Sequence, residues 1–482
     1  MQITGFGFLY LFLAASLIAY YTFCKQYQPW FLLLISILFI FSHSVFGIVF
    51  MILSSLCVYL CALKYPGQTK GVLISVVVTV GLLIGLKYVP SISFLHMDTA
   101  FISKWLFPIG ISYYTLQLLS YSIDVYREKI SAEIKYWKVL LFTCYFPQLV
   151  QGPISRYDQL EPQLVTTHAY SSHNIKYGVQ LMVWGVFKKM VIADRYGKYV
   201  RIIFESGTLP KGLAAWLGLL YYGFQLYGDF SGGIDIIRGI SQCFGIDLVE
   251  NFRQPYFSKS LGEFWRRWHI SLGSWMKDYM FYPLSMSKWM RKIEKKLKKL
   301  TDRKTSAHIV GAISNILVFL LVGVWHGTGT NFTAWGLYNG CILAFSTIAI
   351  PLYANMKKSL HITGKERWYS VFCLVRTFLI VTIGWIFDTT YTAHDAGILF
   401  KNLFVFSGVG NSLLPALDAT IVLCATLVLL YVDIQHEKGV SLRDTLNTKP
   451  FIVQVIVWTV MIQCIACFGR VASAGGFLYA NF

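Results

Sequence analysis

Long apolar runs separated by short basic segments extend over nearly the whole chain. Runs of about 17 residues or more are long enough for a helix to cross the hydrocarbon core of a membrane, and shorter runs are typical of half-spans or re-entrant pieces. We therefore expect an all-α polytopic membrane protein with about 11–13 transmembrane or re-entrant helices. The candidate segments are 5–23, 30–41, 44–63, 71–89, 106–121, 136–152, 176–193, 212–227, 309–325, 332–353, 370–387, 417–432 and 451–469.

Composition supports a membrane protein and removes one class of partner. The chain is 56% hydrophobic and 13% charged, whereas soluble domains carry about a quarter charged residues. Its net charge of +19 could suggest nucleic acid as a partner, but the basic residues lie mostly in short loops between apolar runs. Orientation by the positive-inside rule explains this pattern better. We expect no nucleic-acid partner and a multi-pass protein of the cytoplasmic membrane.

One helical bundle can account for the whole length, so we expect a single domain over residues 1–482. The run Phe6–Phe23 lacks a positively charged flank and predicts a retained first helix rather than a cleaved signal. The ten cysteines fall mainly in apolar runs, and Cys464 and Cys467 are more typical of small packing residues than of a redox or zinc site. We expect neither disulfides nor a bound metal.

His326 is the first candidate for chemistry. Ile309–Trp325 carries no charge, and His326 follows it directly, before a second apolar run that begins at Phe332. Basic flanks on both runs predict a membrane hairpin open to the cytoplasm. Seventeen helical residues cover roughly 25 Å, so His326 would lie deep in the membrane or past its centre. An ionisable side chain there suggests function, although most buried histidines are hydrogen-bonded core residues.

A neutral imidazole in a low-dielectric pocket can act as general base toward a hydroxyl. Gly327 and Gly329 allow close backbone approach, and Asn331 or backbone N–H groups could stabilise an oxyanion. No Ser-His-Asp order, phosphate loop or zinc-type histidine spacing accompanies His326. Transfer between two bound substrates is therefore favoured over a covalent hydrolase.

A second polar region, Gly228–Pro283, is too polar to cross lipid simply and too apolar to be a free loop. It predicts helices lying at the interface or lining a water-filled cavity. If 261–282 is one helix, His269 shares a face with Trp265, Gly273 and Met276.

Two carboxylates of this region, Asp229 and Asp235, can be interpreted in two ways. They could mark an ion path, as in a transporter, or fix helices through nearby polar partners. The structural role is favoured, and the lack of an internal repeat argues against an inverted-repeat transporter.

A basic segment occupies residues 291–304, with eight basic and two acidic side chains. Trp289, Ile293, Leu297 and Leu300 fall on one face, which predicts an amphipathic helix on anionic lipid. The alternative is that the same surface receives an acidic cytoplasmic partner, such as an acyl carrier protein or a phosphate-bearing coenzyme.

Several motifs together resemble the membrane-bound O-acyltransferases, and within them the bacterial group of the alginate O-acetylation membrane subunit and the teichoic acid D-alanyl transferase. The resemblance extends from about residue 101 to 482, with 1–100 as peripheral helices. The matching segments are Phe146-Pro-Gln-Leu-Val-Gln-Gly-Pro-Ile-Ser-Arg-Tyr157, Tyr227-Gly-Asp-Phe-Ser-Gly232, Asn251-Phe-Arg-Gln-Pro-Tyr256, Glu263-Phe-Trp-Arg-Arg-Trp-His269, Trp275-Met-Lys-Asp278, Trp325-His326-Gly327 and Gly475–Phe482.

The resemblance implies a helical bundle around a central tunnel. It implies His326 as the catalytic histidine and His269 as the second, on the donor side, positioning the donor or relaying a proton. Asp278 would orient a neighbouring group. No bound cofactor is expected; the substrate would be an acyl thioester, acetyl-CoA or a loaded acyl carrier protein.

The expected function is transfer of an acyl group, acetyl first, to hydroxyls of a cell-envelope polysaccharide, directly or through an extracytoplasmic acetyltransferase- or esterase-like partner. D-alanyl transfer from a carrier protein to teichoic acid is the alternative. A transporter using Asp229 and Asp235, and a scaffold without chemistry, are the remaining rivals.

Overall fold

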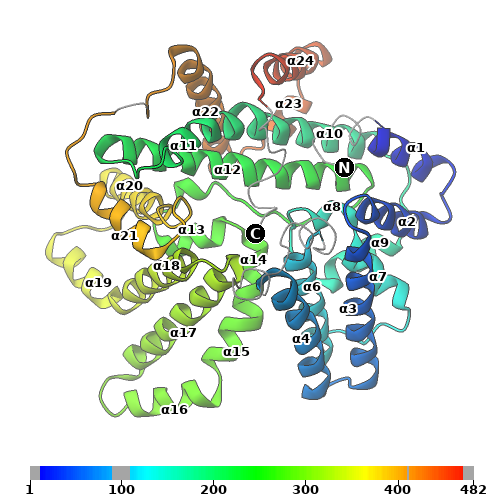
Figure 1. Cartoon of the computed structure of the whole chain (residues 1–482), viewed down its shortest axis with the longest axis horizontal. Coiled ribbons are helices and arrows are strands. Elements are labelled where there is room, and N and C mark those ends of the chain that lie inside the picture. The colour runs from blue at the N-terminus through cyan, green and yellow to red at the C-terminus, as the bar shows by residue number, and fades with distance from the viewer. Residues whose placement is uncertain (1–10, 89–108, 410–411, 471–482) are drawn as a thin grey trace. The chain divides into compact units, whose positions relative to one another are not determined.

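Helices form the regular structure of the computed structural model, which describes residues 11–88, 109–409 and 412–470 (Figure 1). Within these residues there is no strand, and one isolated antiparallel bridge joins Phe252 to Trp268. The all-α prediction is confirmed. The motif at Gly475–Phe482 and parts of the predicted segments 5–23, 71–89 and 106–121 lie outside the described residues.

The described residues form two compact units. Unit 1 holds those up to Phe187 together with Phe230–Glu250, and unit 2 holds Lys188–Asp229 and those from Asn251 to Arg470. One long helix, α12 (Gly212–Cys243), belongs to unit 2 up to Asp229 and to unit 1 beyond it. The expected division at residue 100 stays a prediction.

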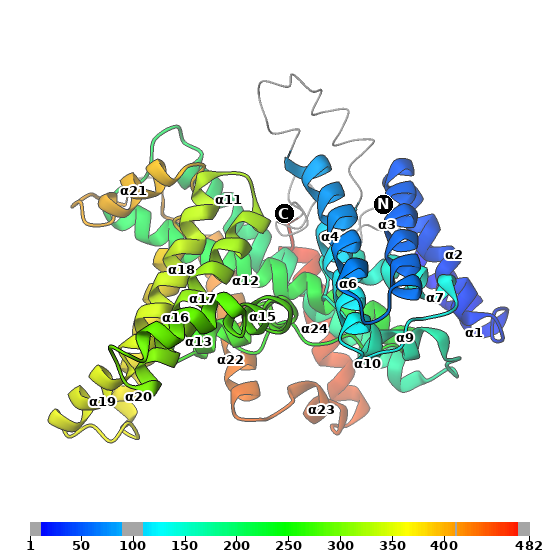
Figure 2. The same cartoon turned by 90° about the horizontal axis from the view of Figure 1, so that it is seen from below.

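Unit 1 buries large aromatic rings between its apolar helices; Tyr20, Phe142 and Phe244 are fully buried. Helices α3, α4 and α6 lie side by side (Figure 2), and Ser122 donates a 3.0 Å hydrogen bond to Ser75 across α6 and α4. The helices are α1 (Ala14–Thr22), α2 (Gln28–Phe41), α3 (Val45–Lys64), α4 (Thr69–Leu83), η2 (Ile84–Tyr88), α6 (Ile111–Tyr126), α7 (Tyr136–Cys144), α8 (Phe146–Leu149), α9 (Tyr157–Val165) and α10 (Ser172–Phe187).

Unit 2 carries both candidate histidines. Its helices, besides the first part of α12, are η6 (Lys188–Ala193), α11 (Asp194–Phe204), η7 (Pro255–Phe257), α13 (Leu261–Arg267), α14 (Ile270–Met276), η8 (Lys277–Phe281), α15 (Tyr282–Ser285), α16 (Lys288–Leu297), α17 (Arg303–His326), α18 (Thr330–Ile348), α19 (Ile350–Ser359), α20 (Arg367–Gly384), α21 (Ala393–Asn402), α22 (Ala416–Glu437), α23 (Leu442–Asn447) and α24 (Phe451–Phe468).

The predicted hairpin is formed by α17 and α18, which pack closely against each other. Asp302 caps α17 by accepting from the backbone N–H groups of Lys304 and Thr305, so the helix begins six residues before the apolar run. Glycine permits the close approach: a Cβ added at Gly336 would lie 2.5 Å from the carbonyl oxygen of Phe319. Small residues at such crossings let helix backbones touch in membranes.

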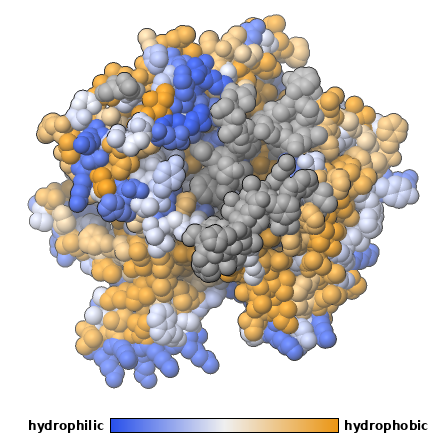
Figure 3. All heavy atoms as spheres, viewed as in Figure 1, coloured by the Kyte–Doolittle hydropathy of each residue, from blue (hydrophilic) through white to orange (hydrophobic). Residues whose placement is uncertain are grey.

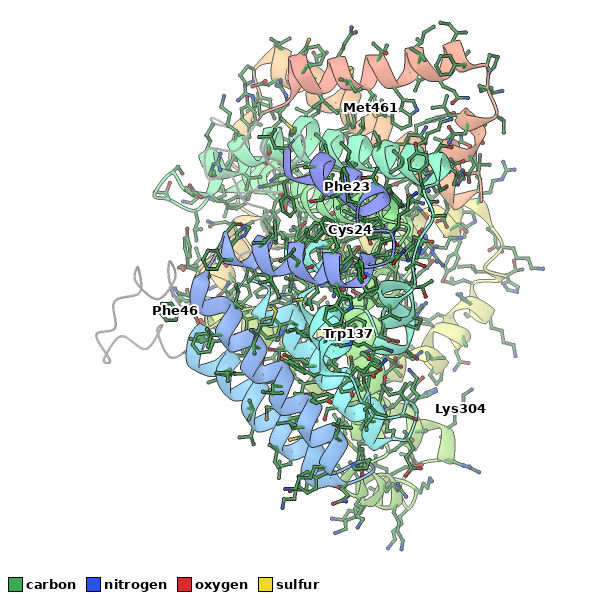
Figure 4. The ribbon with its side chains drawn as sticks, turned by 90° about the vertical axis from the view of Figure 1, so that its right-hand side faces the viewer. Phe23, Cys24, Phe46, Trp137, Lys304 and Met461 are labelled. Carbon is green, nitrogen blue, oxygen red and sulfur yellow. The ribbon has the colours of Figure 1, made fainter. Side chains whose placement is uncertain are left out.

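Six of the described helices are long and apolar enough to cross a membrane, and α18 with α19, bent by 56°, could form a seventh span. The multi-pass prediction is confirmed, while the total of 11–13 segments stays a prediction. Exposed apolar side chains mark these helices, such as Phe46 on α3 (Figure 4). The six are Phe46–Lys64, Thr69–Leu86, Arg303–His326, Arg367–Gly384, Ala416–Glu437 and Phe451–Phe468.

Three local predictions differ from the structure. The helix expected over 212–227 continues to Cys243 as α12, so the polar region begins inside a helix. The segment 136–152 breaks at Tyr145 between α7 and α8. The expected helix over 261–282 also breaks, at Trp268 and His269, so Trp265 of α13 and His269 do not lie on one continuous helical face.

Candidate active site

His326 is the last residue of α17 and is buried, with 7% of its surface exposed. At 1.5 Å per residue, the 24 residues of α17 span about 36 Å, which places His326 at the far end of the helix from the basic segment. Its ring meets Trp325 and Trp335 edge to face, with centroids 5.1 and 5.3 Å away. The two aromatic rings cover part of this buried imidazole.

His269 lies in a turn rather than on a helical face. Its backbone has φ of 48°, the left-handed region, and it precedes the first turn of α14. Left-handed backbone is uncommon outside glycine and costs on the order of 1 kcal/mol or more, so its surroundings must hold it. Asn251 supplies the hold: its carbonyl oxygen accepts from Ile270 N–H at 3.0 Å, and its side-chain oxygen accepts from Ser271 N–H at 2.8 Å.

The histidine turn is also fixed from the preceding side. Arg253 N–H donates to the carbonyl oxygen of Arg267 at 2.9 Å, next to the bridge of Phe252 and Trp268. Arg267 pairs with Glu263 at 2.7 Å and forms a two-pronged pair with Glu437 of α22. The turn is thereby attached to a second helix.

His326 acts electrostatically on His269. The pKa of His269 lies well below its usual value, first because the ring is buried and second because the charge of His326 disfavours protonation. His269 is therefore a neutral imidazole at physiological pH. A neutral ring has one nitrogen that donates and one that accepts, which is what proton transfer requires.

Tryptophan side chains connect the two histidine elements. Trp265 of α13 meets Trp335 of α18 at a centroid distance of 5.4 Å and Phe319 of α17 at 5.5 Å. Because Trp335 also contacts His326, one aromatic cluster reaches from the His269 segment to the end of α17. The structure thus brings together Trp265, Trp325 and both histidines.

The side-chain amide of Asn331 is not placed to donate to an oxyanion. Its side-chain amide is buried and donates to the carbonyl oxygens of Phe387 and Thr390, both at 2.9 Å. Both amide hydrogens are used, so no donor is left for a substrate oxyanion. The contacts instead attach the start of α18 to the turn that follows α20.

Asp229 and Asp278 lie in contrasting surroundings. Asp229 is buried and accepts from the Lys189 ammonium at 2.5 Å, and Lys189 also pairs with Asp194 at 2.8 Å. This arrangement matches the structural interpretation of Asp229, with Lys189 as the partner. Asp278 lies on the exposed side of η8, and its predicted orienting role stays a prediction.

Two residues of interest were missed by sequence reasoning. Asn251 begins a motif that carried the family resemblance, yet nothing in its spacing linked it to His269, eighteen residues later. Asp388 lies four residues after the end of α20, and burial raises its pKa to about 8 although part of its side chain reaches the surface. A carboxyl just after an apolar run was the available signal.

The site offers nitrogen, amide and indole groups rather than a metal site. Within the described ranges, no group of three His, Cys, Asp or Glu residues is arranged to hold a metal ion. A buried, neutral histidine next to a second histidine can move a proton between two reacting groups.

Comparison with known proteins assigns the chain to a family. The sequence profile of MBOAT, the membrane-bound O-acyltransferase family, matches residues 74–297. A probable alginate O-acetylase of Pseudomonas syringae is 30% identical over 88% of this chain and 79% of its own length. The peptidoglycan O-acetyltransferase of Helicobacter pylori is 30% identical over 65% of this chain and 59% of its own.

A third relative is more distant. The teichoic acid D-alanyltransferase of Bacillus subtilis is 28% identical over 57% of this chain and 67% of its own length. The family profile and the three relatives, together with the helical architecture, confirm the resemblance seen in the motifs. The chain is a multi-pass membrane enzyme that belongs to the membrane-bound O-acyltransferase family.

Proposed function

We propose that this protein moves an acetyl group from a cytoplasmic thioester to a hydroxyl of a cell-envelope polysaccharide, directly or through an extracytoplasmic partner. One observation carries the proposal: unit 2 holds two buried histidines close enough for the charge of one to lower the pKa of the other. Ester formation from a thioester needs a base for the hydroxyl and a route for its proton to the leaving sulfur.

His326 is the base in this mechanism. Its imidazole removes the hydroxyl proton as the oxygen attacks the thioester carbonyl carbon, and the carbon–sulfur bond then breaks. Its place at the far end of α17 suits an acceptor that arrives from the side opposite the basic segment. The aromatic rings of Trp325 and Trp335 exclude water, which would otherwise compete as acceptor.

The choice of acetyl and polysaccharide is supported by the relatives. Several relatives named probable alginate O-acetylase are 30–33% identical to this chain, and the peptidoglycan O-acetyltransferase is 30% identical. The two D-alanyltransferases are 25% and 28% identical. Acetyl is the acyl group named in the more similar group.

D-alanyl transfer from a carrier protein is the alternative, and one surface favours it. Nine basic side chains and two acidic ones surround α16 and the start of α17, and all nine basic residues are exposed. Figure 3 shows the surface around α16 as strongly hydrophilic. Figure 4 labels Lys304, at the start of α17, in the same region. We call it the basic surface: Lys288, Arg291, Lys292, Lys295, Lys296, Lys298, Lys299, Arg303 and Lys304.

The basic surface differs in detail from its sequence prediction. Helix α16 ends at Leu297, and Met290 is its fully buried anchor, whereas Trp289 and Leu300 are exposed. Such a surface attracts anionic lipid, the phosphates of coenzyme A or an acidic carrier protein. It would therefore serve either donor on the cytoplasmic side.

The experiment compares the envelope of a deletion strain with strains that express the wild type, His326→Ala or His308→Ala. Ester-linked groups are released by mild base and identified by mass spectrometry. We expect deletion and His326→Ala to remove acetyl from the polysaccharide fraction. His308→Ala, a change on the same helix far from the site, should restore it.

Each other outcome identifies a rival. Loss of D-alanine instead of acetyl would establish the alternative donor. Restoration of full acetylation by His326→Ala would contradict the proposal and favour a scaffold that only anchors other enzymes.

A further inference from the structure

The side chain of Asn251 contacts the His269 turn through its one oxygen. The side-chain oxygen lies 2.8 Å from the backbone nitrogen of Ser271 and 3.4 Å from Nδ1 of His269. Asn251 and His269 are 1% and 3% exposed, so solvent does not replace these contacts. Both residues belong to unit 2.

The orientation of the Asn251 amide follows from its partner. A backbone N–H can only donate, so the atom 2.8 Å from Ser271 N must be the amide oxygen and not the NH₂ group. Turning the amide over would set two donors against each other in a buried place, which costs on the order of 1–3 kcal/mol. The oxygen is therefore fixed next to His269.

The same reasoning fixes the tautomer of His269. An amide oxygen can only accept, so Nδ1 of His269 must carry the hydrogen in the 3.4 Å contact. A neutral imidazole has one N–H, which leaves Nε2 as the nitrogen with the lone pair. Nε2 can accept a proton but cannot donate one to a substrate carbonyl until it has first been protonated.

We propose that Asn251 is the positioning residue of His269: it holds the ring as the Nδ1–H tautomer and thereby assigns Nε2 as a proton acceptor. This inference rests on the proposed acyl transfer and decides between the two roles expected for His269. His269 relays the proton rather than positioning the thioester by donating a hydrogen bond to its carbonyl.

The proton balance of the transfer is then complete. The hydroxyl O–H bond breaks, the oxygen bonds to the acyl carbon, and His326 holds the proton first. Nε2 of His269 receives it and gives it to the sulfur as the carbon–sulfur bond breaks, so the products are an ester and a thiol. Because burial disfavours the charged ring of His269, the protonated ring gives the proton on to the sulfur.

Asn251 also contributes a second group to the site. Its side-chain nitrogen is buried and has no hydrogen-bond acceptor among the described residues. Buried amide hydrogens are rarely left unpaired in proteins, so this N–H group suits a substrate oxygen. A variant at 251 should therefore alter substrate binding as well as the histidine.

The direct test is ¹⁵N NMR of the purified full-length protein in detergent with labelled histidine, in which the His269 signals are identified by their loss in His269→Gln. The wild type should show the Nδ1–H tautomer, and Asn251→Leu, which removes the acceptor, should show mixed tautomers or Nε2–H. A wild-type His269 with hydrogen on Nε2 would overturn the inference.

Activity provides a second readout through Asn251→Asp, which keeps an oxygen acceptor for Ser271 N–H. The added carboxylate stabilises protonated His269, so the acid limb of the pH–rate profile should move upward by a unit or more. His326 is the titratable group whose charge is found to act on His269 among the described residues, and it is present in both proteins. A lowered rate with an unmoved profile would contradict the relay.

The matched control is Asn402→Asp, a buried asparagine at the end of α21 whose amide donates to the Pro210 carbonyl oxygen. It should leave the profile unmoved. The tautomer measurement does not depend on catalysis, so inactivity of the wild type toward acetyl thioesters would count against the proposed function and leave the assignment of His269 standing.

Discussion

His269 and His326 occupy one buried environment but are held by different kinds of backbone. His326 ends a 24-residue helix and takes its position from helix packing. His269 lies in a left-handed turn held by Asn251. A proton relay needs two groups whose surroundings give them different affinities for the proton. The two backbone settings place the two imidazoles in such different surroundings.

Asp388 predicts a pH dependence of stability. Burial raises its pKa to about 8 in the folded protein, whereas the unfolded chain has the usual value near 4. Between these values the folded state keeps a proton that the unfolded state has lost, so stability falls as pH rises from about 4 to about 8.

The measurement is thermal unfolding of the wild type and Asp388→Asn in detergent across that pH range. Because the asparagine does not titrate, the variant should gain melting temperature relative to the wild type as pH rises, and the gain should level off above about 8. A difference between the two proteins that is constant with pH would contradict the assignment.

Lys189 and Asp229 predict a buried structural pair. Lys189→Met leaves Asp229 and Asp194 without their shared cation, which typically costs about 3–5 kcal/mol for a buried charge. The double variant Lys189→Met with Asp229→Asn should lose less stability than the two single losses combined, because the stranded charge is gone.

Thermal stability and ion flux in proteoliposomes provide the measurements for this pair. The structural account expects coupled stability losses and no ion flux. Flux through the wild type that disappears in Asp229→Asn would instead revive the ion-path interpretation.

At the scale of the elements, the packing of the hairpin depends on close contact between α17 and α18. A Cβ at Gly336 would lie 2.5 Å from the Phe319 carbonyl oxygen and 3.0 Å from Cα of Leu320. Gly336→Leu should therefore force the helices apart, cost about 1–3 kcal/mol and reduce transfer more than tenfold by moving His326.

The control on the same hairpin is Gly311→Ala, because a Cβ at Gly311 meets no atom within 4 Å. It should leave activity unchanged and stability equal or slightly higher, since alanine favours the helix. Melting temperature and transfer rate measured on both variants check the prediction. Equal effects of the two changes would show that helix contact does not position His326.

Much of the element pattern could be predicted from the sequence, and the exceptions share one physical cause. Apolar period and charge gave the α17–α18 hairpin and the position of His326. The break at His269 was not predictable locally, because Asn251 stabilises the turn from eighteen residues away. Likewise α12 continues through Asp229 because Lys189, forty residues earlier, pairs with the carboxylate.

At the scale of the whole molecule, family membership and the basic surface both concern the acyl donor and its binding. The basic surface carries a formal excess of seven positive charges, from nine basic and two acidic side chains. A charge-reversed variant, Lys295→Glu with Lys296→Glu, should weaken productive encounter with an anionic donor, most strongly at low salt.

The rate of transfer against salt concentration checks this prediction in proteoliposomes of neutral lipid. We expect a rate reduced about tenfold or more at low salt that approaches the wild type at high salt. Lys358→Glu with Lys365→Glu, also exposed and in unit 2, is the control. Equal losses in both variants would show that overall charge matters and not this surface.

The most direct test of the central claim follows a labelled acetyl group from thioester to polysaccharide in proteoliposomes. The wild type should place label in base-labile ester linkage on the acceptor. His326→Ala, inserted and folded to the same extent, should be at least a hundredfold slower, as expected for loss of a general base. Transfer at an unchanged rate by His326→Ala would contradict the account.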